Sequence, residues 1–172
     1  MIVELLPSNE SNNKKVKIST YDDTNKKDIQ NVTYFLAISK NNENLLREYF
    51  FAKDGTLTLD VFPDDSNQVQ ILSEQQYDHN AYVVSDMTPL QVKGPIFSKD
   101  GTYAFDIELR TIDDPENWVF SLSGFHSEII IGKDIAFKET FTEDKSSLQT
   151  EDFFRKIFSY YKTPILLNEI FK

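Results

Sequence analysis

Two acidic side chains on one predicted strand have the spacing best suited to hydrolytic chemistry. Residues 103–111, YAFDIELRT, alternate apolar and polar side chains, so Asp106 and Glu108 are expected to share one face of a strand. Positions two apart on a strand lie roughly 7 Å apart, which resembles the gap between the paired carboxylates of glycoside hydrolases. Arg110 continues the same row, so a solvated, charge-paired sheet face is the alternative interpretation.

Three acidic loops form a second candidate site, for a hard metal cation. The stretches YDDTN (21–25), PDDSN (63–67) and IDDPEN (112–117) each bring carboxylate and amide oxygens together. Oxygen ligands suit Ca²⁺, which extracellular modules bind at roughly millimolar affinity. None of the loops has EF-hand spacing, and Asp and Asn also favour turns for backbone reasons, so ordinary turns are the alternative. The candidate calcium ligands are Asp22, Asp23, Asp64, Asp65, Asp113 and Asp114.

The remaining side chains with reactive or stacking potential are few. Neither His79 nor His126 lies in a nucleophile motif, so no catalytic residue is assigned to a covalent mechanism. A copper or zinc site would require the fold to bring both histidines together with Met87 and carboxylates. A solvated loop for His79 and a strand start for His126 are the alternatives. Trp118 is either a platform for a sugar ring or a buried residue of the strand WVFSL.

The net charge restricts the classes of partner. The chain of 172 residues carries a formal charge of −10, which disfavours nucleic acid because phosphate binding needs a basic face. A protein or cell-surface partner and self-association remain. No apolar run approaches the roughly 20 residues of a transmembrane helix. MIVELLP has too short an apolar stretch and no basic flank for a signal peptide, so an exported form is expected to have lost its signal ahead of Met1.

The sequence predicts that short strands separated by turns position these residues. Strands are expected at 16–22, 31–40, 45–52, 56–61, 69–72, 81–84, 90–92, 103–111, 117–125, 128–131 and 135–141. This pattern predicts a mostly β fold, an antiparallel, immunoglobulin-like β-sandwich. AKDGTLTLDV (52–61) and SKDGTYAFDI (98–107) share one sequence pattern, a Lys-Asp-Gly-Thr turn followed by an alternating strand. Each Asp-Gly is expected to close a hairpin.

The two copies fit two arrangements, one large sandwich or two small β subdomains. The second arrangement, favoured because residues 73–80 are polar, divides the chain into subdomains at 1–72 and 81–142. A short helical segment is expected at 150–172, because Thr150 can cap a helix and Phe154, Ile157, Phe158 and Tyr161 recur at helical spacing. The segment either packs on the sandwich or offers a docking face.

Two long stretches carry a family resemblance. NVTYFLAISKNNENLLREYFFAKDGTLTLDV and VKGPIFSKDGTYAFDIELRTIDDPENWVF resemble a group of uncharacterised exported proteins of ammonia-oxidising archaea. The likeness covers roughly residues 16–142 and rests on structural motifs, and the tail beyond about residue 145 departs from it. The resemblance implies export and a cell-surface or periplasm-like location, with no activity to transfer. TYDDTNKKDIQNVTYFLAIS is also loosely similar to the opening of transthyretin-like and surface-adhesin sandwiches.

These observations lead to three hypotheses of different classes. The first is a non-enzymatic exported β-sandwich module that acts by binding or assembly at the cell surface, for which the many aromatic side chains would supply interface anchors. The second is a metal-linked protein, stabilised by calcium or acting as a copper carrier or accessory factor. The third is a carbohydrate-active enzyme that uses Asp106 and Glu108.

Overall fold

The described part of the chain is built mostly of β-strands, as predicted. The computed structural model describes residues 1–6, 12–22, 24–25, 27–77, 80–118, 124–132 and 137–138, with the side chains of 114–118 and 137–138 excepted. All of these residues belong to one compact unit, residues 1–142. The predicted helical segment at 150–172 lies outside the described residues. The described residues contain no helix that is long and apolar enough to span a membrane.

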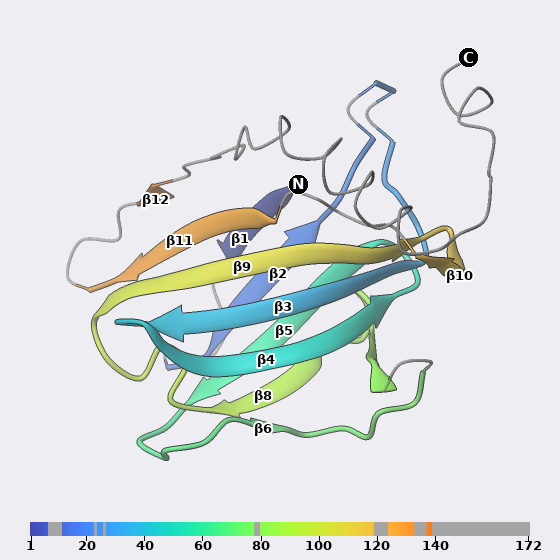
Figure 1. The fold of residues 1–172 in the computed structure, drawn as a ribbon. Helices are drawn as coiled ribbons and strands as arrows, with labels where there is room; N and C mark the ends of the chain where they lie inside the picture. The colour runs from blue at the N-terminus through green and yellow to red at the C-terminus, as the bar shows by residue number, and fades with distance from the viewer. Residues whose placement is uncertain are drawn as a thin grey trace, which may run out of the picture. The chain divides into compact units, whose positions relative to one another are not determined.

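Two sheets pack face to face as a β-sandwich (Figure 1). The five-stranded sheet has the order β1 (Ile2–Leu6), β2 (Lys14–Ser19), β5 (Thr56–Pro63), β8 (Leu90–Gly94) and β6 (Gln70–Ile71). The seven-stranded sheet has the order β12 (Phe137–Lys138), β11 (Phe125–Ile131), β9 (Gly101–Ile112), β3 (Val32–Lys40), β4 (Glu43–Ala52) and β7 (Tyr82–Val84), with β10 (Asp114–Trp118) paired to β9. Residues 2–6 had no predicted strand, and they form the edge strand β1.

Strands from both halves of the sequence interleave in each sheet. In the five-stranded sheet β8 lies between β5 and β6, and in the seven-stranded sheet β9 lies between β3 and β11. One continuous core joins Ile18 and Leu59 of the first sheet to Leu36 and Phe105 of the second, all fully buried. The described strands of 1–72 and 81–142 are therefore shared between the same two sheets, and the expected division into two β subdomains is not what the strand order gives.

Both Lys-Asp-Gly-Thr segments carry the chain from one sheet to the other, so the hairpin prediction is wrong. Residues 53–56 lead from β4 into β5 of the opposite sheet, and residues 99–102 lead from β8 into β9. Glycine supplies the left-handed backbone in each, with φ of 78° at Gly55 and 137° at Gly101. In each segment the strand that follows the glycine pairs in the opposite sheet and does not fold back on the strand before it.

Each sheet contains one parallel pair of strands among antiparallel ones, and the connections between the sheets explain why. The chain passes from the seven-stranded to the five-stranded sheet twice, between β4 and β5 and again between β7 and β8. Because the two crossings run in the same direction, β4 pairs with β7 and β5 with β8 in parallel. Asp54 ties the crossings together, since its carboxylate accepts from Thr56 N at 3.0 Å and from Asp86 N at 3.1 Å. The other pairings between described strands are antiparallel, as expected.

The hairpin between β3 and β4 sets the register of two neighbouring strands of the seven-stranded sheet. Asn41 and Asn42 form its two-residue turn with φ of 50° and 64°, the pair of positive angles that such turns require. An irregularity between Thr33 and Tyr34 in the pairing of β3 with β9 then sets Thr111 opposite Thr33, and the two buried hydroxyls lie 2.6 Å apart. The register of three neighbouring strands is thereby fixed at both ends of β3.

Candidate binding face on the seven-stranded sheet

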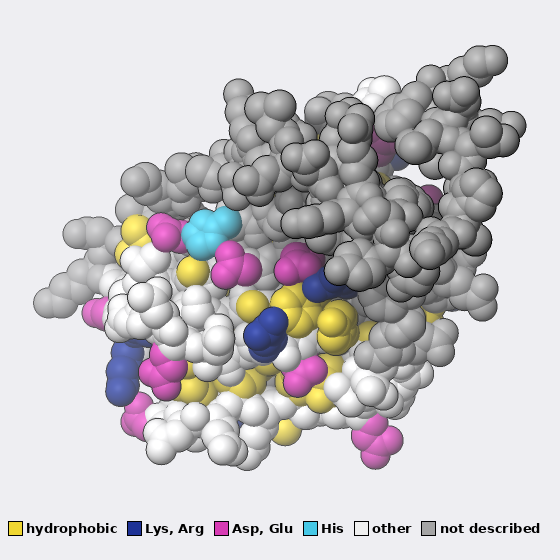
Figure 2. Space-filling model, in the orientation of Figure 1, with side chains coloured by type: hydrophobic (Ala, Val, Ile, Leu, Met, Phe, Trp, Pro, Cys, Tyr) yellow, Lys and Arg dark blue, Asp and Glu magenta, His cyan; other side chains and the backbone are white. Residues whose placement is uncertain are grey.

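The outer face of the seven-stranded sheet, the side turned away from the core, carries an ordered set of polar and aromatic side chains. Strand alternation buries Leu36 of β3 and Ile107 of β9 in the core. The residues directly before and after each of them on its strand therefore point outward. Cross-strand pairing then forms two adjacent rows. One row is His126, Asp106, Ala37 and Arg47, and the next is Glu108, Phe35 and Tyr49. Figure 2 shows hydrophobic side chains on this face between basic and acidic ones.

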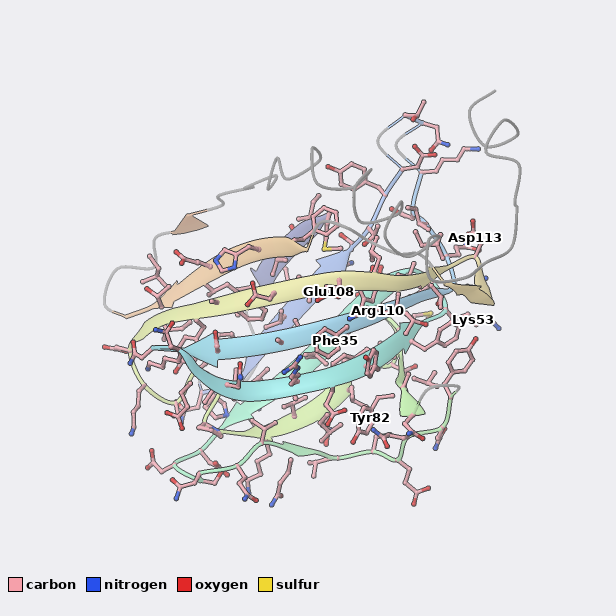
Figure 3. All side chains as sticks on the ribbon, in the orientation of Figure 1. Phe35, Lys53, Tyr82, Glu108, Arg110 and Asp113 are labelled. Carbon is pink, nitrogen blue, oxygen red and sulfur yellow. The ribbon has the colours of Figure 1, made fainter. Side chains whose placement is uncertain are left out.

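The centre of the face is an aromatic–arginine cluster, made of Phe35, Tyr49, Arg47 and Arg110. The rings of Phe35 and Tyr49 lie 5.0 Å apart at an angle of 51°. The guanidinium of Arg47 lies 5.3 Å from the Phe35 ring centroid, and that of Arg110 lies 5.4 Å from it. Figure 3 shows Phe35 beside Arg110 and Glu108 on the neighbouring strand. Each cation–π contact stabilises the exposed arrangement by about 0.5–1 kcal/mol.

Aromatic packing continues from this cluster toward β7. Phe51 lies two residues beyond Tyr49 on the same side of β4, opposite Thr33 of β3 and Val83 of β7. Its ring stacks on that of Tyr77, with centroids 3.7 Å apart and planes 9° from parallel. Val83 beside it is exposed. The outer face therefore presents arginines and aromatic rings over three neighbouring strands.

The two candidate carboxylates lie on this face, as the alternation predicted, and each has its own basic partner. Asp106 Oδ1 lies 2.7 Å from His126 Nδ1, and Glu108 Oε2 lies 2.6 Å from an amino nitrogen of Arg110. Glu128 Oε1 lies 3.7 Å from the other ring nitrogen of the histidine. The geometry is that of the charge-paired sheet face given as the alternative interpretation.

The histidine on this face is held between two carboxylates. The hydrogen bond to Asp106 raises the pKa of His126 above its ordinary value, and the charges of Asp106 and Glu128 act in the same direction. Partial burial of the ring opposes them but is the smaller effect. The two carboxylates thus favour the imidazolium form of the ring, and its contacts with Asp106 and Glu128 link β9 and β11. His126 is the second residue of β11, close to the strand start that the sequence predicted.

The acidic loops are organised as turns in the described residues. Asp22 Oδ1 accepts from Thr24 N at 2.7 Å, and Asp64 Oδ1 accepts from Ser66 N at 2.9 Å. The Ser66 hydrogen bonds lower the pKa of Asp64, with Lys93 contributing in the same direction. Asp65 and Asp113 are exposed, and Asp113 has a left-handed φ of 62°.

A metal site is not assembled by the residues that the structure describes. They contain no group of three or more histidine, aspartate or glutamate side chains placed to hold an ion. Asp23, His79 and the side chains of Asp114 and Trp118 lie outside the described residues, so the interpretations of these four stay predictions. Met87 is 94% exposed in the segment between β7 and β8.

The central residues of this face, Phe35, Tyr49 and Arg47, were missed by the sequence reading. Phe35 lies in the run YFLAI, where apolar residues on both faces hide the alternation. Arg47 and Tyr49 are two apart in LLREYFF, and this period of two was the available signal. Their union with Arg110 depends on the pairing of β9 with β3, which brings together residues far apart in the chain.

Comparison with known proteins adds no relative to this account. No protein-family model, curated protein or solved structure matches the chain.

Proposed function

We propose that this chain is a non-enzymatic binding module of an exported protein, and that it contacts a protein partner at the cell surface through the outer face of the seven-stranded sheet. The observation that carries the proposal is the aromatic–arginine cluster, in which two guanidinium groups and a second ring surround Phe35. Arginine and tyrosine are the residue types that most often dominate binding energy at protein interfaces.

The state of the two arginines supports a contact role. Arg110 is engaged by Glu108, whereas Arg47 is exposed and has no carboxylate partner among the described residues. A planar guanidinium held over a ring is already oriented, so little side-chain entropy is lost when a partner carboxylate binds it. Arg47 therefore suits the rim of an interface whose centre is Phe35 and Tyr49.

The outer face of the five-stranded sheet has a different character. Its basic side chains are engaged in ion pairs, Lys15 with Asp60 at 3.5 Å and Lys17 with Asp86 at 3.1 Å. Surface ion pairs of this kind contribute little to stability. Their charged groups are already engaged, so few unpaired charged groups remain there to bind a partner. Of the two outer faces, the seven-stranded sheet is thus the better binding surface.

A glycosidase function for Asp106 and Glu108 has less support. Such an enzyme needs one carboxyl group that keeps its proton near neutral pH, normally in an apolar pocket. The Asp106 side chain is 60% exposed and that of Glu108 is 37% exposed. Both lie on an open sheet face.

The cell-surface location rests on the resemblance of residues 16–142 to exported archaeal proteins.

The proposal is tested by the effect of cluster substitutions on partner binding. The partner is first captured on the immobilised chain from the surface fraction of cells that express it, and its affinity is then measured with purified components. Arg47→Ala with Tyr49→Ala should weaken binding at least about thirtyfold, which corresponds to loss of hot-spot contacts. The matched control, Lys15→Ala with Gln91→Ala, changes the opposite sheet and should bind as the wild type does. Equal binding by the cluster variant, or equal loss in the control, would refute the assignment.

A further inference from the structure

A hollow at one end of the sandwich forms a second candidate site, separate from the aromatic–arginine cluster. It has a volume of about 290 Å³ and is lined by residues of the β3–β4 hairpin, the segment after β5, the β8–β9 connection and the start of β9. Three connections that are distant in sequence therefore line one concave surface. Binding sites are common in such positions, because loops supply varied side chains on a rigid scaffold.

The wall of the hollow is anchored by a lysine whose hydrogen-bond donors are all used. Lys40 Nζ donates to the carbonyls of Lys99 at 2.9 Å and Asp100 at 2.8 Å, and to Tyr103 Oη at 3.2 Å. The ammonium also lies 4.6 Å from the Tyr103 ring centroid. Lys40 therefore holds the β8–β9 connection in place and has no N–H left for a ligand.

The hydroxyl groups that line the hollow also direct their protons into the protein. Ser66 Oγ donates to Gln68 O at 2.9 Å, Ser98 Oγ donates to Pro95 O at 3.0 Å, and Tyr103 Oη donates to Lys99 O at 2.8 Å. Carbonyl oxygens can only accept, so the direction of each bond is fixed. Toward a ligand, the two serine oxygens can offer only lone pairs, whereas Tyr103 Oη already accepts from Lys40 Nζ at 3.2 Å and from Lys99 N at 3.4 Å.

The charged residues of the lining make the site rich in acceptors without giving it a net charge. Glu43 and Asp65 add carboxylate oxygens, while Lys40 and Lys99 supply two positive charges, so the formal sum is zero. The two ammonium groups oppose a bound metal cation, and the two carboxylates oppose an anion. A neutral ligand with many hydroxyl donors satisfies this lining best.

The geometry points to a carbohydrate-binding site, and we propose that the hollow binds a sugar residue of a neutral glycan. The amides of Asn41 and Asn67 can both donate to and accept from ligand hydroxyls. Leu45 and Pro95 give apolar surface for the C–H groups of a pyranose ring. The site would let the module hold a surface glycan independently of its protein partner.

The loops around the hollow are fixed before any ligand arrives. Asp64 N donates to Gly94 O at 2.8 Å, and the Asp64 carboxylate holds Ser66 N, so the loop after β5 is tied to β8. In the β8–β9 connection Phe97 adopts a φ of 62°, a costly conformation for a bulky residue, and its buried ring packs edge-on against Tyr103 at 4.9 Å. A preformed lining lowers the entropy that binding must overcome.

Amide chemical shifts of the full chain report directly on this proposal. Glucose, galactose, mannose, N-acetylglucosamine and their disaccharides are titrated one at a time, with sodium acetate and ammonium chloride as charged probes. At least one neutral saccharide should shift amides confined to residues 40–45, 64–68 and 95–103. Asn67→Ala should weaken that binding about tenfold, and Gln91→Ala on the opposite sheet should leave it unchanged.

Two outcomes would overturn the proposal. One is that no neutral saccharide shifts the lining amides. The other is that acetate or ammonium shifts them as strongly, which would assign the hollow to a charged ligand. The spectrum of each variant shows whether it is folded, so a loss of binding is not confused with a loss of structure. Neither outcome bears on the aromatic–arginine cluster, whose residues lie outside the lining.

Discussion

The hydroxyl of Tyr34 lies 2.6 Å from the carbonyl oxygen of Gly55, and this contact ties the β4–β5 crossing to the start of β3. Since a carbonyl only accepts, the tyrosine donates to Gly55 and receives its second hydrogen bond from Thr20 Oγ1 at 2.8 Å. The ring is fully buried, and burial raises the pKa of Tyr34 far above its ordinary value. Burial therefore favours the neutral hydroxyl, which is the form that donates to Gly55.

Removing this hydroxyl should be costly. Tyr34→Phe leaves the buried Gly55 carbonyl without its donor and Thr20 without its acceptor, so unfolding in urea should show a loss of about 1–3 kcal/mol at an unchanged slope. Tyr49→Phe is the control, because its ring lies on the outer face, and it should stay within about 0.5 kcal/mol of the wild type. If both variants unfold alike, the Tyr34 lock does not exist.

A methyl group at Gly55 should prevent the crossing from forming. A Cβ there would lie 1.6 Å from the backbone oxygen of Ile29, and the residue also has a φ of 78°. Gly55→Ala should destabilise the fold by more than about 3 kcal/mol, beyond the cost of backbone strain alone. Gly132→Ala is the matched control, since the nearest atom to its Cβ would be 3.9 Å away. Circular dichroism during thermal unfolding separates the two, and a folded Gly55→Ala protein of normal stability would contradict the turn geometry.

The second link between crossings should also be measurable. Asp54→Ala removes the acceptor of both Thr56 N and Asp86 N, and the expected loss is about 1–3 kcal/mol. Asp65→Ala, in an exposed turn position, serves as the comparison and should change little. Hydrogen exchange at Thr56 and Asp86 should accelerate selectively in the first variant. Uniform acceleration over the whole sandwich would instead indicate a general loss of stability.

The histidine on the outer face should make stability depend on pH in one direction. Its pKa is raised in the folded state, so its contribution is fully present below the ordinary histidine pKa and is lost as pH rises through the raised value. The difference in unfolding free energy between the wild type and His126→Gln should therefore shrink as the solution becomes alkaline.

The partner carboxylate provides the control for this titration. Asp106→Asn removes the main cause of the raised pKa, so the His126 titration followed by NMR should move to lower pH in that variant. The residual shift should then report the weaker contact with Glu128, whose carboxylate oxygen lies 3.7 Å from the ring. A His126 titration that is unaffected by Asp106→Asn would contradict the 2.7 Å hydrogen bond.

The strands were predictable from sequence to the extent that their patterns are local. Alternation located 31–40 and 103–111 close to β3 and β9, and it set Asp106 and Glu108 on one face. The crossings at Gly55 and Gly101 were not predictable, because an Asp-Gly turn looks the same whether the next strand pairs locally or joins the other sheet.

The candidate sites show the same limit. The partnership of His126 with Asp106 depends on the register of β11 against β9, and the hollow depends on three loops meeting in space. Neither depends on a pattern within one segment. The chemistry of single residues was predictable from the sequence. The His126–Asp106 pair and the hollow were not, because they form only when the strands and loops meet in the tertiary structure.

Site-specific crosslinking tests the central claim, the binding role of the outer face, most directly. The chain has no cysteine, so Ala37→Cys, between Asp106 and Arg47 in the row, and Gln91→Cys, on the outer face of the other sheet, each accept a single photocrosslinker. Irradiated with the purified partner, the Ala37→Cys protein should form one covalent complex that Arg47→Ala with Tyr49→Ala abolishes, and the Gln91→Cys protein should form none. Crosslinking from Gln91→Cys alone, or from neither position while binding persists, would place the contact surface elsewhere and contradict the account.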